Sequence, residues 1–402
     1  MKIMMLLPGN FPPDLRVENE IKALVNAGHK IILVCQTTNE ADKSIEYEPS
    51  KSLTIYRLFL NKLIYKSSVA ALTLPFYFNF WSRKLKEITS RENDIDAIHV
   101  HDLPLARLGF VLSRKLNIPF VLDLHENYPE LLAISEHTNT FIGRILSPIS
   151  LWKHYEKKYL KLASKIIVVV EEARDRILKI GINNEDVVIV SNTLDTSSVG
   201  QINLNMNDVD PTELFYGGGV TKHRGLQFVL KGIKLLLDRG IEVNFHIVGA
   251  GRYLEELKKL AINLGVNDHV FFYGHLKYND MLKILAASHI AVIPHIKSGH
   301  TDSTIPHKIF QYIYFGLPIL STNCLPLVRI INETHAGLIY KFDDPVDFSE
   351  KFIELKQNIN YFDPNYGRNI LFKKYIWNYD ANRLVDLYVN LKNSKSYFLH
   401  GQ

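Results

Sequence analysis

The chain has 402 residues, enough for two or three domains at the usual size of roughly 100–200 residues each. Hydrophobic residues make up 47% and charged residues 22%, which excludes a chain that is disordered, collagen-like or a coiled coil as a whole. The net charge of +5 is too small to indicate nucleic-acid binding by itself. Two widely separated cysteines, Cys35 and Cys324, exclude a disulfide framework and fit a reducing cytoplasm.

No segment has the pattern of a secretion signal or a membrane span. The N-terminal apolar run is short, lacks a cleavage site and predicts a β-strand at residues 3–7. The strongest apolar segment, residues 67–81, is interrupted by Pro75 and Asn79 and is shorter than the ~20 residues that cross a bilayer. We therefore expect neither secretion nor a transmembrane helix.

Short apolar segments alternate with amphipathic ones in the first half of the chain. Strands that are apolar on both faces are typical of parallel sheets covered by helices. We predict strands at residues 3–7, 31–35, 53–58, 95–100, 120–124, 165–170 and 187–190. We predict helices at residues 15–27, 105–116 and 149–162.

The alternation stops in the polar stretch 192–211, the best candidate for a linker, and then resumes. Strands are predicted at residues 214–216, 243–248, 270–273, 290–293 and 318–321. Helices are predicted at residues 226–237, 253–264, 278–287 and 308–315. Repeated βα units indicate an α/β chain with two doubly wound parallel sheets, at 1–195 and 205–375, facing each other across a cleft.

Ligands of doubly wound sheets bind beyond the carboxyl ends of the strands, which directs attention to the βα loops. In the first domain, such loops hold Asp14 and Arg16, then His101 with Asp102, then His125 with Glu126. A structural alternative is that Asp14 only caps a helix and Arg16 pairs with the glutamate four residues on. The histidine–carboxylate pairs could also bind a metal, although no spacing selects one.

In the second domain, three glycines precede Lys222 and Arg224 and then a helix. Exposed backbone N–H groups, a helix N-terminus and two basic residues favour a phosphate, although the P-loop pattern is absent. Gly249 and Gly251 follow the next strand and could pack against a base. The stretch 300–321 leads from a polar Thr/Asp/Ser segment into a helix that carries Lys308 and Gln311 on one face.

These segments, taken in order, resemble retaining glycosyltransferases of family 4, nucleotide-sugar enzymes with the two-Rossmann GT-B fold. The resemblance covers nearly the whole chain. The resemblance rests on the segments 11–20, 99–103, 123–130, 191–192, 217–225, 247–251, 272–275 and 305–321. The segment 376–402 resembles the family's terminal helix, which crosses back to the first domain.

The resemblance implies roles for individual residues. His125 would face the reacting sugar, Arg224 would contact the donor pyrophosphate, with Lys222 as an alternative, and Lys308 would help to stabilise the leaving group. The family's Glu-x7-Glu motif is replaced by Ser303 and Gln311, in a Pro-His-Lys–Phe-Gln-Tyr arrangement. The remaining implied donor contacts are Gly218, Gly219, Gly249, Gly251, Gly274, Asp302, Thr304 and Ile305. Asp14, Arg16, His101 and Glu126 are assigned to the acceptor side.

The implied reaction is metal-independent transfer of a hexosyl or N-acetylhexosaminyl group to a hydroxyl acceptor, with retention and without a cofactor. We expect a UDP-sugar rather than a GDP-sugar donor and a lipid-linked or glycan acceptor of bacterial surface-polysaccharide or glycolipid synthesis. We expect a cytoplasmic location at the inner face of the membrane. Two alternatives remain open: a nucleotide-sugar 2-epimerase of the same fold, and a catalytically silent sugar-nucleotide-binding or scaffold protein.

The basic residues are concentrated in one segment. Residues 51–91 carry eight Lys or Arg side chains and one Glu, a net charge of +7, interleaved with aromatic residues. Such a composition favours a membrane interface and predicts peripheral membrane contact there rather than nucleic-acid binding. The alternative is a helix packed on the domain with its charges in solvent.

Overall fold

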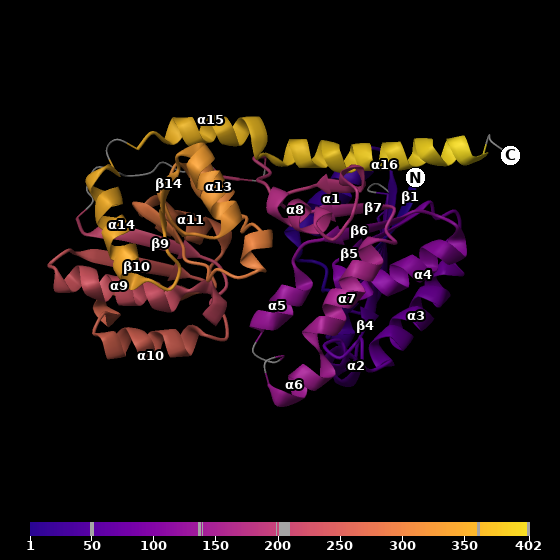
Figure 1. Cartoon of the computed structure of the whole chain (residues 1–402), viewed down its shortest axis with the longest axis horizontal. Coiled ribbons are helices and arrows are strands. Elements are labelled where there is room, and N and C mark those ends of the chain that lie inside the picture. The colour runs from indigo at the N-terminus through magenta and orange to yellow at the C-terminus, as the bar shows by residue number, and fades with distance from the viewer. Residues whose placement is uncertain are drawn as a thin grey trace. The chain divides into compact units, whose positions relative to one another are not determined.

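The computed structural model describes residues 1–48, 52–135, 138, 140–197, 199–200, 210–359 and 362–399 (Figure 1). The chain forms two compact units. Unit 1 comprises Met1–Ser191 together with Asn378–Gln402, and unit 2 comprises Asn192–Trp377. Within the predicted linker, residues 198 and 201–209 lie outside the described part of the chain.

Unit 1 is built on a sheet in which the described residues form eight strands, in the order β3-β4-β2-β1-β5-β6-β7-β8. Neighbouring strands are parallel except for β3, which is antiparallel to β4. The strands are β1 (Lys2–Leu7), β2 (Lys30–Thr37), β3 (Ser44–Glu48), β4 (Leu53–Phe59), β5 (Ala97–His101), β6 (Phe120–Leu124), β7 (Lys165–Val168) and β8 (Val187–Ile189).

The three helices predicted in the first half of the chain correspond to α1, α4 and α7, and the pattern did not predict α2, α3, α5, α6 or α8 individually. Helix α1 begins after Asp14, whose side chain accepts a hydrogen bond from the N–H of Val17. Helix α4 ends at Asn117, which takes the left-handed conformation that terminates helices. The helices are α1 (Leu15–Asn26), α2 (Lys62–Ser67), α3 (Phe76–Thr89), α4 (Ala106–Leu116), α5 (Tyr128–Ile134), α6 (Phe141–Leu146), α7 (Ile149–Leu160), α8 (Glu171–Leu178) and most of α16 (Trp377–Leu399).

Unit 2 has a parallel sheet whose described strands follow the order β11-β10-β9-β12-β13-β14. They are β9 (Thr212–Gly217), β10 (Val243–Val248), β11 (Val270–Gly274), β12 (Ile290–Ile293), β13 (Ile319–Thr322) and β14 (Gly337–Tyr340). The helices are α9 (Leu226–Asp238), α10 (Leu254–Leu264), α11 (Tyr278–Ala286), α12 (Lys308–Phe315), α13 (Leu325–Thr334), α14 (Pro345–Gln357) and α15 (Pro364–Lys374). A continuous apolar core includes Phe245 and Phe348, both fully buried.

The predicted fold class, two doubly wound parallel-sheet domains, is confirmed by this topology. The sequence pattern missed β3 and β14. It also ended the strand before His101 at residue 100, whereas β5 includes His101. The strand ends there because Asp102 adopts a φ of +62°, outside the extended region, while its N–H donates to the carbonyl of Asp123.

The aromatic residues of segment 51–91 belong mostly to the core of unit 1. Tyr77, Phe78, Phe80 and Trp81 of α3 are buried, so they do not offer an interfacial surface as the membrane prediction requires. The alternative, a helix packed on the domain, describes α3 correctly. None of the described helices has the length and apolar character of a membrane span.

The packing of α4 on the sheet leaves no room for a side chain at Gly109. A Cβ there would lie 2.2 Å from Cγ2 of Val100 and 3.0 Å from Cε2 of Phe120. We predict that Gly109→Ala destabilises unit 1 by about 1–3 kcal/mol, more than the gain of ~1 kcal/mol in helix propensity. Urea unfolding measures this. The matched control is Gly219→Ala, where a Cβ would meet no atom within 4 Å; equal unfolding midpoints for the two variants would contradict the packing argument.

Candidate active site

The carboxyl ends of β5 and β6 bring together the polar side chains of unit 1. His99 and His101 lie two residues apart on β5 and therefore share one face of the sheet, and Asp123 of β6 is the ladder partner of His101. Helix α1 supplies Arg16 and Glu20 over the same region, one turn apart. All five side chains are buried, and they are called the histidine–carboxylate cluster below.

Arg16 provides the permanent positive charge of the cluster. Its Nη2 lies 2.8 Å from Oδ1 of Asp123 and 3.0 Å from Oε1 of Glu20. Its Nη1 donates a hydrogen bond of 2.8 Å to the carbonyl of Val190. Burial alone would raise the pKa of Asp123, but Arg16 and His125 hold it well below its usual range. The Arg16–Glu20 contact, which the sequence offered as a structural alternative, is therefore present, together with the contact between Arg16 and Asp123.

His125 is the partly exposed end of this network, with 13% of its side chain reached by solvent. Its Nε2 lies 2.8 Å from Oδ2 of Asp123 and 3.2 Å from Nδ1 of His101. Its backbone N–H donates to Oδ1 of Asp102 at 3.1 Å. Burial alone would lower the pKa of His125, but Asp123 and Asp102 raise it to about 9. At neutral pH His125 is therefore a cation that is in contact with solvent.

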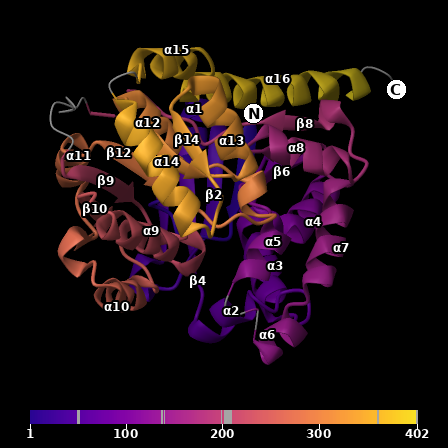
Figure 2. The ribbon, with the colours of Figure 1, turned by 60° about the vertical axis from the view of Figure 1, so that its left-hand side comes forward.

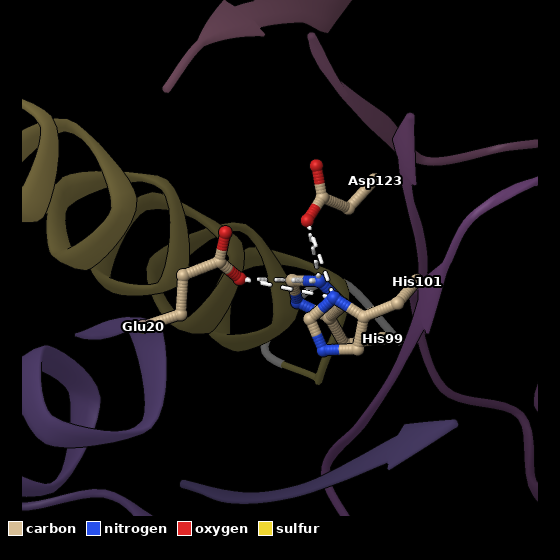
Figure 3. A group of neighbouring side chains, drawn as sticks. All are labelled: Glu20, His99, His101 and Asp123. Atoms are coloured by element: carbon tan, nitrogen blue, oxygen red, sulfur yellow. Dashed lines mark hydrogen bonds and ion pairs between the residues drawn. The ribbon is translucent and has the colours of Figure 1, made fainter. Parts of the chain in front are cut away.

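Glu20, His99, His101 and Asp123 each offer a donor atom within 4.8 Å of the others (Figure 3). Figure 3 shows both carboxylates pointing toward the two imidazole rings. These residue types can bind a divalent cation. However, burial and the neighbouring aspartate raise the pKa of Glu20 to about 8, and burial lowers the pKa of both histidines. Because the Arg16 guanidinium and the His125 imidazolium already outnumber the single ionised carboxylate, Asp123, a divalent cation would add to an excess of positive charge here.

Helix α16 completes the cluster from the far end of the chain. The hydroxyl of Tyr388 lies 2.7 Å from Nδ1 of His99, and the tyrosine is fully buried. Burial raises the pKa of Tyr388 well above its usual range, so this group stays a neutral phenol. About two turns earlier in the same helix, the side chain of Asp380 accepts a hydrogen bond of 3.0 Å from the N–H of Ser191. The C-terminal helix is thus tied to the polar core of unit 1.

The other residues predicted on the acceptor side lie in the loops around this cluster. Asp14 caps α1, and Glu126 is half-buried after β6. A pocket of about 420 Å³ opens nearby, between the β1–α1 loop and strands β2 to β4. Arg57 on its wall donates to the carbonyl of Phe11 at 2.8 Å and to Oγ of Ser44 at 2.7 Å. The pocket therefore combines an aromatic side chain with hydroxyl and charged groups.

In unit 2, the glycine loop after β9 is locked against the loop after β10. The N–H of Gly218 donates to the carbonyl of Val248 at 2.8 Å. A Cβ at Gly249 would lie 1.9 Å from the carbonyl oxygen of Gly218, and a Cβ at Gly251 would lie 2.0 Å from that of Val220. Both positions need glycine because two backbones approach closely there.

The two remaining predicted glycines adjoin the same loops. Gly219 is exposed, and its carbonyl accepts the hydroxyl of Tyr216 at 2.7 Å. Gly274 ends β11 with a φ of +66°, and its carbonyl accepts the N–H of Gly249 at 2.7 Å. The predicted glycines of three successive βα loops thus line one edge of the sheet.

Arg224 belongs to a single 3₁₀ turn, Lys222–Arg224, in which Lys222 is exposed. The next residue, Gly225, lets this turn pack against the chain after β12, because a Cβ there would lie 1.8 Å from the carbonyl oxygen of Pro294. Nη1 of Arg224 lies 2.8 Å from Nε2 of His295. Burial, and then Arg224, lower the pKa of His295 well below its usual range, so the neutral imidazole accepts this hydrogen bond.

Lys308 opens α12 and faces the glycine loop. Its Nζ lies 3.9 Å from the centre of the Tyr216 ring, within range of a cation–π interaction. A Cβ at Gly218 would lie 2.6 Å from the same nitrogen. Burial, and then the neighbouring Arg224, lower the pKa of Lys308 well below its usual range. Within the described residues, no carboxylate pairs with Lys308 or Arg224, so this part of unit 2 is electropositive.

The polar turn before α12 makes mostly internal bonds. Oδ1 of Asp302 lies 2.7 Å from Nζ of Lys297 and accepts the N–H of Leu325 at 2.9 Å, which holds this carboxylate toward α13. The hydroxyls of Ser303 and Thr304 donate to carbonyls of the same turn at 2.9 and 3.2 Å. Their side chains therefore stabilise the turn itself.

Helix α12 has the bounds that the sequence pattern predicts, Lys308–Phe315. Ile305 before it is buried, and Gln311 is half-buried one turn after Lys308. The helix ends at Gly316, whose φ of +84° is the left-handed conformation of a C-terminal glycine. The predicted donor-binding residues of unit 2 therefore share the loop edge of its sheet.

Sequence reasoning missed several partners in these sites. Tyr216 lies under the ammonium of Lys308, His295 orients Arg224, and Lys297 pairs with Asp302. Tyr388 lies in the segment 376–402, which the sequence predicts as the terminal helix, but the sequence predicts no contact for this residue. His295 could have been found, because it follows the carboxyl end of a predicted strand as His101 and His125 do.

Two family models match the chain. The model described as Glycosyltransferase Family 4 matches residues 15–198, and the model described as Glycosyl transferases group 1 matches residues 204–362. A curated relative, the uncharacterized glycosyltransferase MJ1178 of Methanocaldococcus jannaschii, is 23% identical over 267 residues, which are 66% of either chain.

Two further matches carry more specific names. The alpha-monoglucosyldiacylglycerol synthase of Streptococcus pneumoniae is 22% identical over 263 residues, which are 62% of this chain and 57% of that protein. The structure of Anabaena Alr3699/HepE in complex with UDP superposes with a TM-score of 0.68 at 12% identity and covers 97% of this chain and all (100%) of that one. At this identity the likeness shows the fold, which is the GT-B fold.

The matched models account for both units, and the structure has the two parallel sheets of that fold. The chain therefore belongs to the family 4, group 1 glycosyltransferases.

Proposed function

We propose that this glycosyltransferase moves a sugar from a nucleoside diphosphate sugar to a hydroxyl of a lipid-linked acceptor, with retention at the anomeric carbon. The observation that supports this best is the electropositive edge of unit 2, where Arg224 and Lys308 have no carboxylate partner among the described residues. An anionic diphosphate would supply the missing negative charge beside backbone glycines.

The two cations suit a leaving group rather than a neutral sugar. As the glycosidic bond breaks, negative charge grows on the diphosphate, and fixed positive groups stabilise that charge more than they stabilise the bound substrate. Arg224 is held by His295, and Lys308 lies over the Tyr216 ring, so both are positioned before the donor arrives. Stabilisation of this kind requires little reorganisation during the reaction.

We assign His125 of unit 1 to the reacting sugar. It is the solvent-reached member of the network around Asp123, and its raised pKa keeps it a hydrogen-bond donor at neutral pH. Glu20 is fully buried and largely protonated near pH 7, which makes it a poor nucleophile. We therefore favour a front-face substitution without a covalent intermediate or a metal ion, in which a phosphate oxygen takes the acceptor proton.

Arg16 and His101, predicted on the acceptor side, are buried. In this mechanism they act by holding Asp123 and His125 in place rather than by touching the acceptor. The pocket between the β1–α1 loop and β4 is the candidate site for the polar head of the acceptor. Its carboxylate, guanidinium and hydroxyl groups can hydrogen-bond sugar hydroxyls, and Phe11 lies on its wall.

The relatives support the substrate classes. The Streptococcus pneumoniae relative is named for the synthesis of a glycolipid, which favours a lipid acceptor and work at the cytoplasmic face of a membrane. The Anabaena structure contains UDP, which favours a UDP-sugar over a GDP-sugar. We propose a hexosyl or N-acetylhexosaminyl donor on the same basis.

A thermal-shift screen of nucleotide sugars tests the donor class. A ligand at 100 times its Kd should stabilise the protein by about 2.7 kcal/mol, visible as a rise in Tm. We expect UDP and a UDP-sugar to raise the Tm more than their GDP counterparts do. If no nucleoside diphosphate or nucleotide sugar shifts the transition, the proposed function is wrong.

Arg224→Ala should lower kcat/KM for transfer by roughly 10²–10³-fold, since one preorganised electrostatic donor is removed. The matched control is Lys222→Ala, because Lys222 is exposed in the same 3₁₀ turn and is the alternative phosphate contact. Steady-state transfer assays compare the two. If Lys222→Ala lowered kcat/KM more than Arg224→Ala does, Lys222 rather than Arg224 would be the residue that contacts the diphosphate.

The pH profile of transfer tests His125. Because its pKa in the folded protein is about 9, the activity that needs the imidazolium should persist through neutral pH and decline as the pH rises through 9. Asp102→Asn removes a charge that raises this pKa and keeps an oxygen for the His125 N–H. Asparagine also tolerates the positive φ of this position.

We therefore predict that Asp102→Asn moves the alkaline limb of kcat to lower pH. The contribution of His125 to folding stability changes with pH in the same direction as the activity. This contribution is complete below the unfolded pKa near 6.5 and is lost as the pH rises through 9. An unchanged alkaline limb in Asp102→Asn would show that His125 is not the titrating group.

A further inference from the structure

Unit 1 exposes large apolar side chains on two short helices. On α6, Phe141, Ile142 and Ile145 are 81%, 67% and 59% exposed. On α2, Leu63 is 71% exposed and Tyr65 is 46% exposed. Isolated exposed apolar residues are normal, but a group of them on neighbouring elements indicates a surface that binds something.

The apolar face of α6 follows directly from its sequence. The three exposed residues have the spacing i, i+1 and i+4, which places them on one face of a helix. Gly143 lies on the opposite, buried face. The helix is also capped, because Oγ1 of Thr140 accepts the N–H of Gly143 at 3.0 Å. Its orientation is therefore fixed by packing and capping, and the apolar side chains are left outside.

Helices α2 and α6 lie at the same end of unit 1 (Figures 1 and 2). The connection between α2 and α3 is joined to α6 by a hydrogen bond of 2.7 Å from Oγ1 of Thr73 to the carbonyl of Leu146. Phe76, which opens α3 after this connection, is 52% exposed. The exposed apolar side chains of the two helices and Phe76 are called the α2/α6 surface below.

Helices α2 and α6 themselves carry basic side chains and no acidic ones. Lys62, Lys66 and Arg144 are exposed on the two helices. The sequence contains no Asp or Glu in residues 60–86 or in residues 140–155. Apolar side chains that enter the acyl boundary, with basic groups around them, are the pattern of a protein bound at the surface of an anionic bilayer.

We propose that the α2/α6 surface docks this protein on a bilayer that contains anionic lipid. A second copy of the chain fits less well, because an isologous interface would bring the patch with Lys62, Lys66 and Arg144 against the same basic patch of the other copy. The proposal extends the proposed function by naming the surface that meets the membrane of a lipid-linked acceptor. Docking on the bilayer can nevertheless be measured without any transfer reaction.

Site-specific labelling tests the docking. Both native cysteines are fully buried, so a single introduced cysteine takes an environment-sensitive fluorophore. Ile142→Cys reports on α6, and Ile262→Cys, 64% exposed on α10 of unit 2, is the matched control. We expect a blue shift and brighter emission for the label at 142 with phosphatidylcholine vesicles containing phosphatidylglycerol, and none for the label at 262. No change at 142 would overturn the proposal.

Vesicle co-sedimentation of the unlabelled protein measures the contributions of the apolar and basic groups. The variant Phe141→Ser/Ile142→Ser/Ile145→Ser should weaken binding at least about tenfold, since burial of apolar area drives such attachment. Lys62→Ser/Lys66→Ser/Arg144→Ser should weaken binding by roughly fivefold per residue on anionic vesicles and have little effect on phosphatidylcholine alone. Bilayer docking would be contradicted if the triple serine variant of α6 bound vesicles as well as the wild type does. It would also be contradicted if the wild type were a dimer and this variant a monomer.

The thermal shift with nucleotide sugars separates this proposal from the proposed function. These side chains lie on exposed helices outside the assigned sites, so the surface variants should keep the wild-type shift while losing vesicle binding. If the protein bound vesicles but no nucleotide sugar changed its Tm, the proposed function would be wrong and the docking proposal would still hold.

Discussion

The arrangement of unit 1 depends on the burial of one guanidinium group. Arg16 contacts Asp123 on β6, Glu20 on its own helix and the carbonyl of Val190 directly after β8. A buried charge is tolerated when it is paired and hydrogen-bonded, and leaving it unpaired is costly. The contacts of Arg16 therefore join the first helix, the middle of the sheet and the chain that follows β8. The same ion pair keeps Asp123 ionised, and Asp123 in turn keeps His125 charged.

The candidate site of unit 2 consists of backbone groups and of two basic side chains that have no carboxylate partner in the described part of the chain. Gly249 and Gly251 allow two loops to touch, which leaves no space for any side chain between them. Arg224 and Lys308 flank this edge with aromatic and imidazole partners in place of carboxylates. Such partners orient a cation without cancelling its charge. These partners therefore leave the positive charge of the edge unneutralised, which favours the binding of an anion.

The sequence predicted most of the fold because parallel strands and their helices have strong local patterns. The bounds of α12 were predicted correctly from its apolar periodicity and Gly316. The edge strand β3 was missed since its SIEYE pattern is short and charged, and it is defined by its antiparallel pairing with β4. The aromatic residues around Trp81 were assigned to a membrane interface, whereas tertiary packing places them in the core.

The candidate sites were predicted unevenly for a similar reason. Residues at the carboxyl ends of strands, such as His125 and Arg224, can be found from topology alone. The contact between Tyr388 and His99 joins positions 289 residues apart, and no local pattern contains it. The exposed face of α6 was also missed, because the sequence shows apolar residues there but not which of them are left uncovered.

The lowered pKa of Lys308 has a consequence for the proposed binding of a diphosphate beside it. If a diphosphate binds there as proposed, its negative charge raises the pKa of this lysine, so binding of the diphosphate and the proton affinity of Lys308 are linked. The heat measured on binding would then depend on the ionisation enthalpy of the buffer. In the proposed reaction, the site would hold a diphosphate less firmly as the solution becomes more alkaline and the lysine loses its proton.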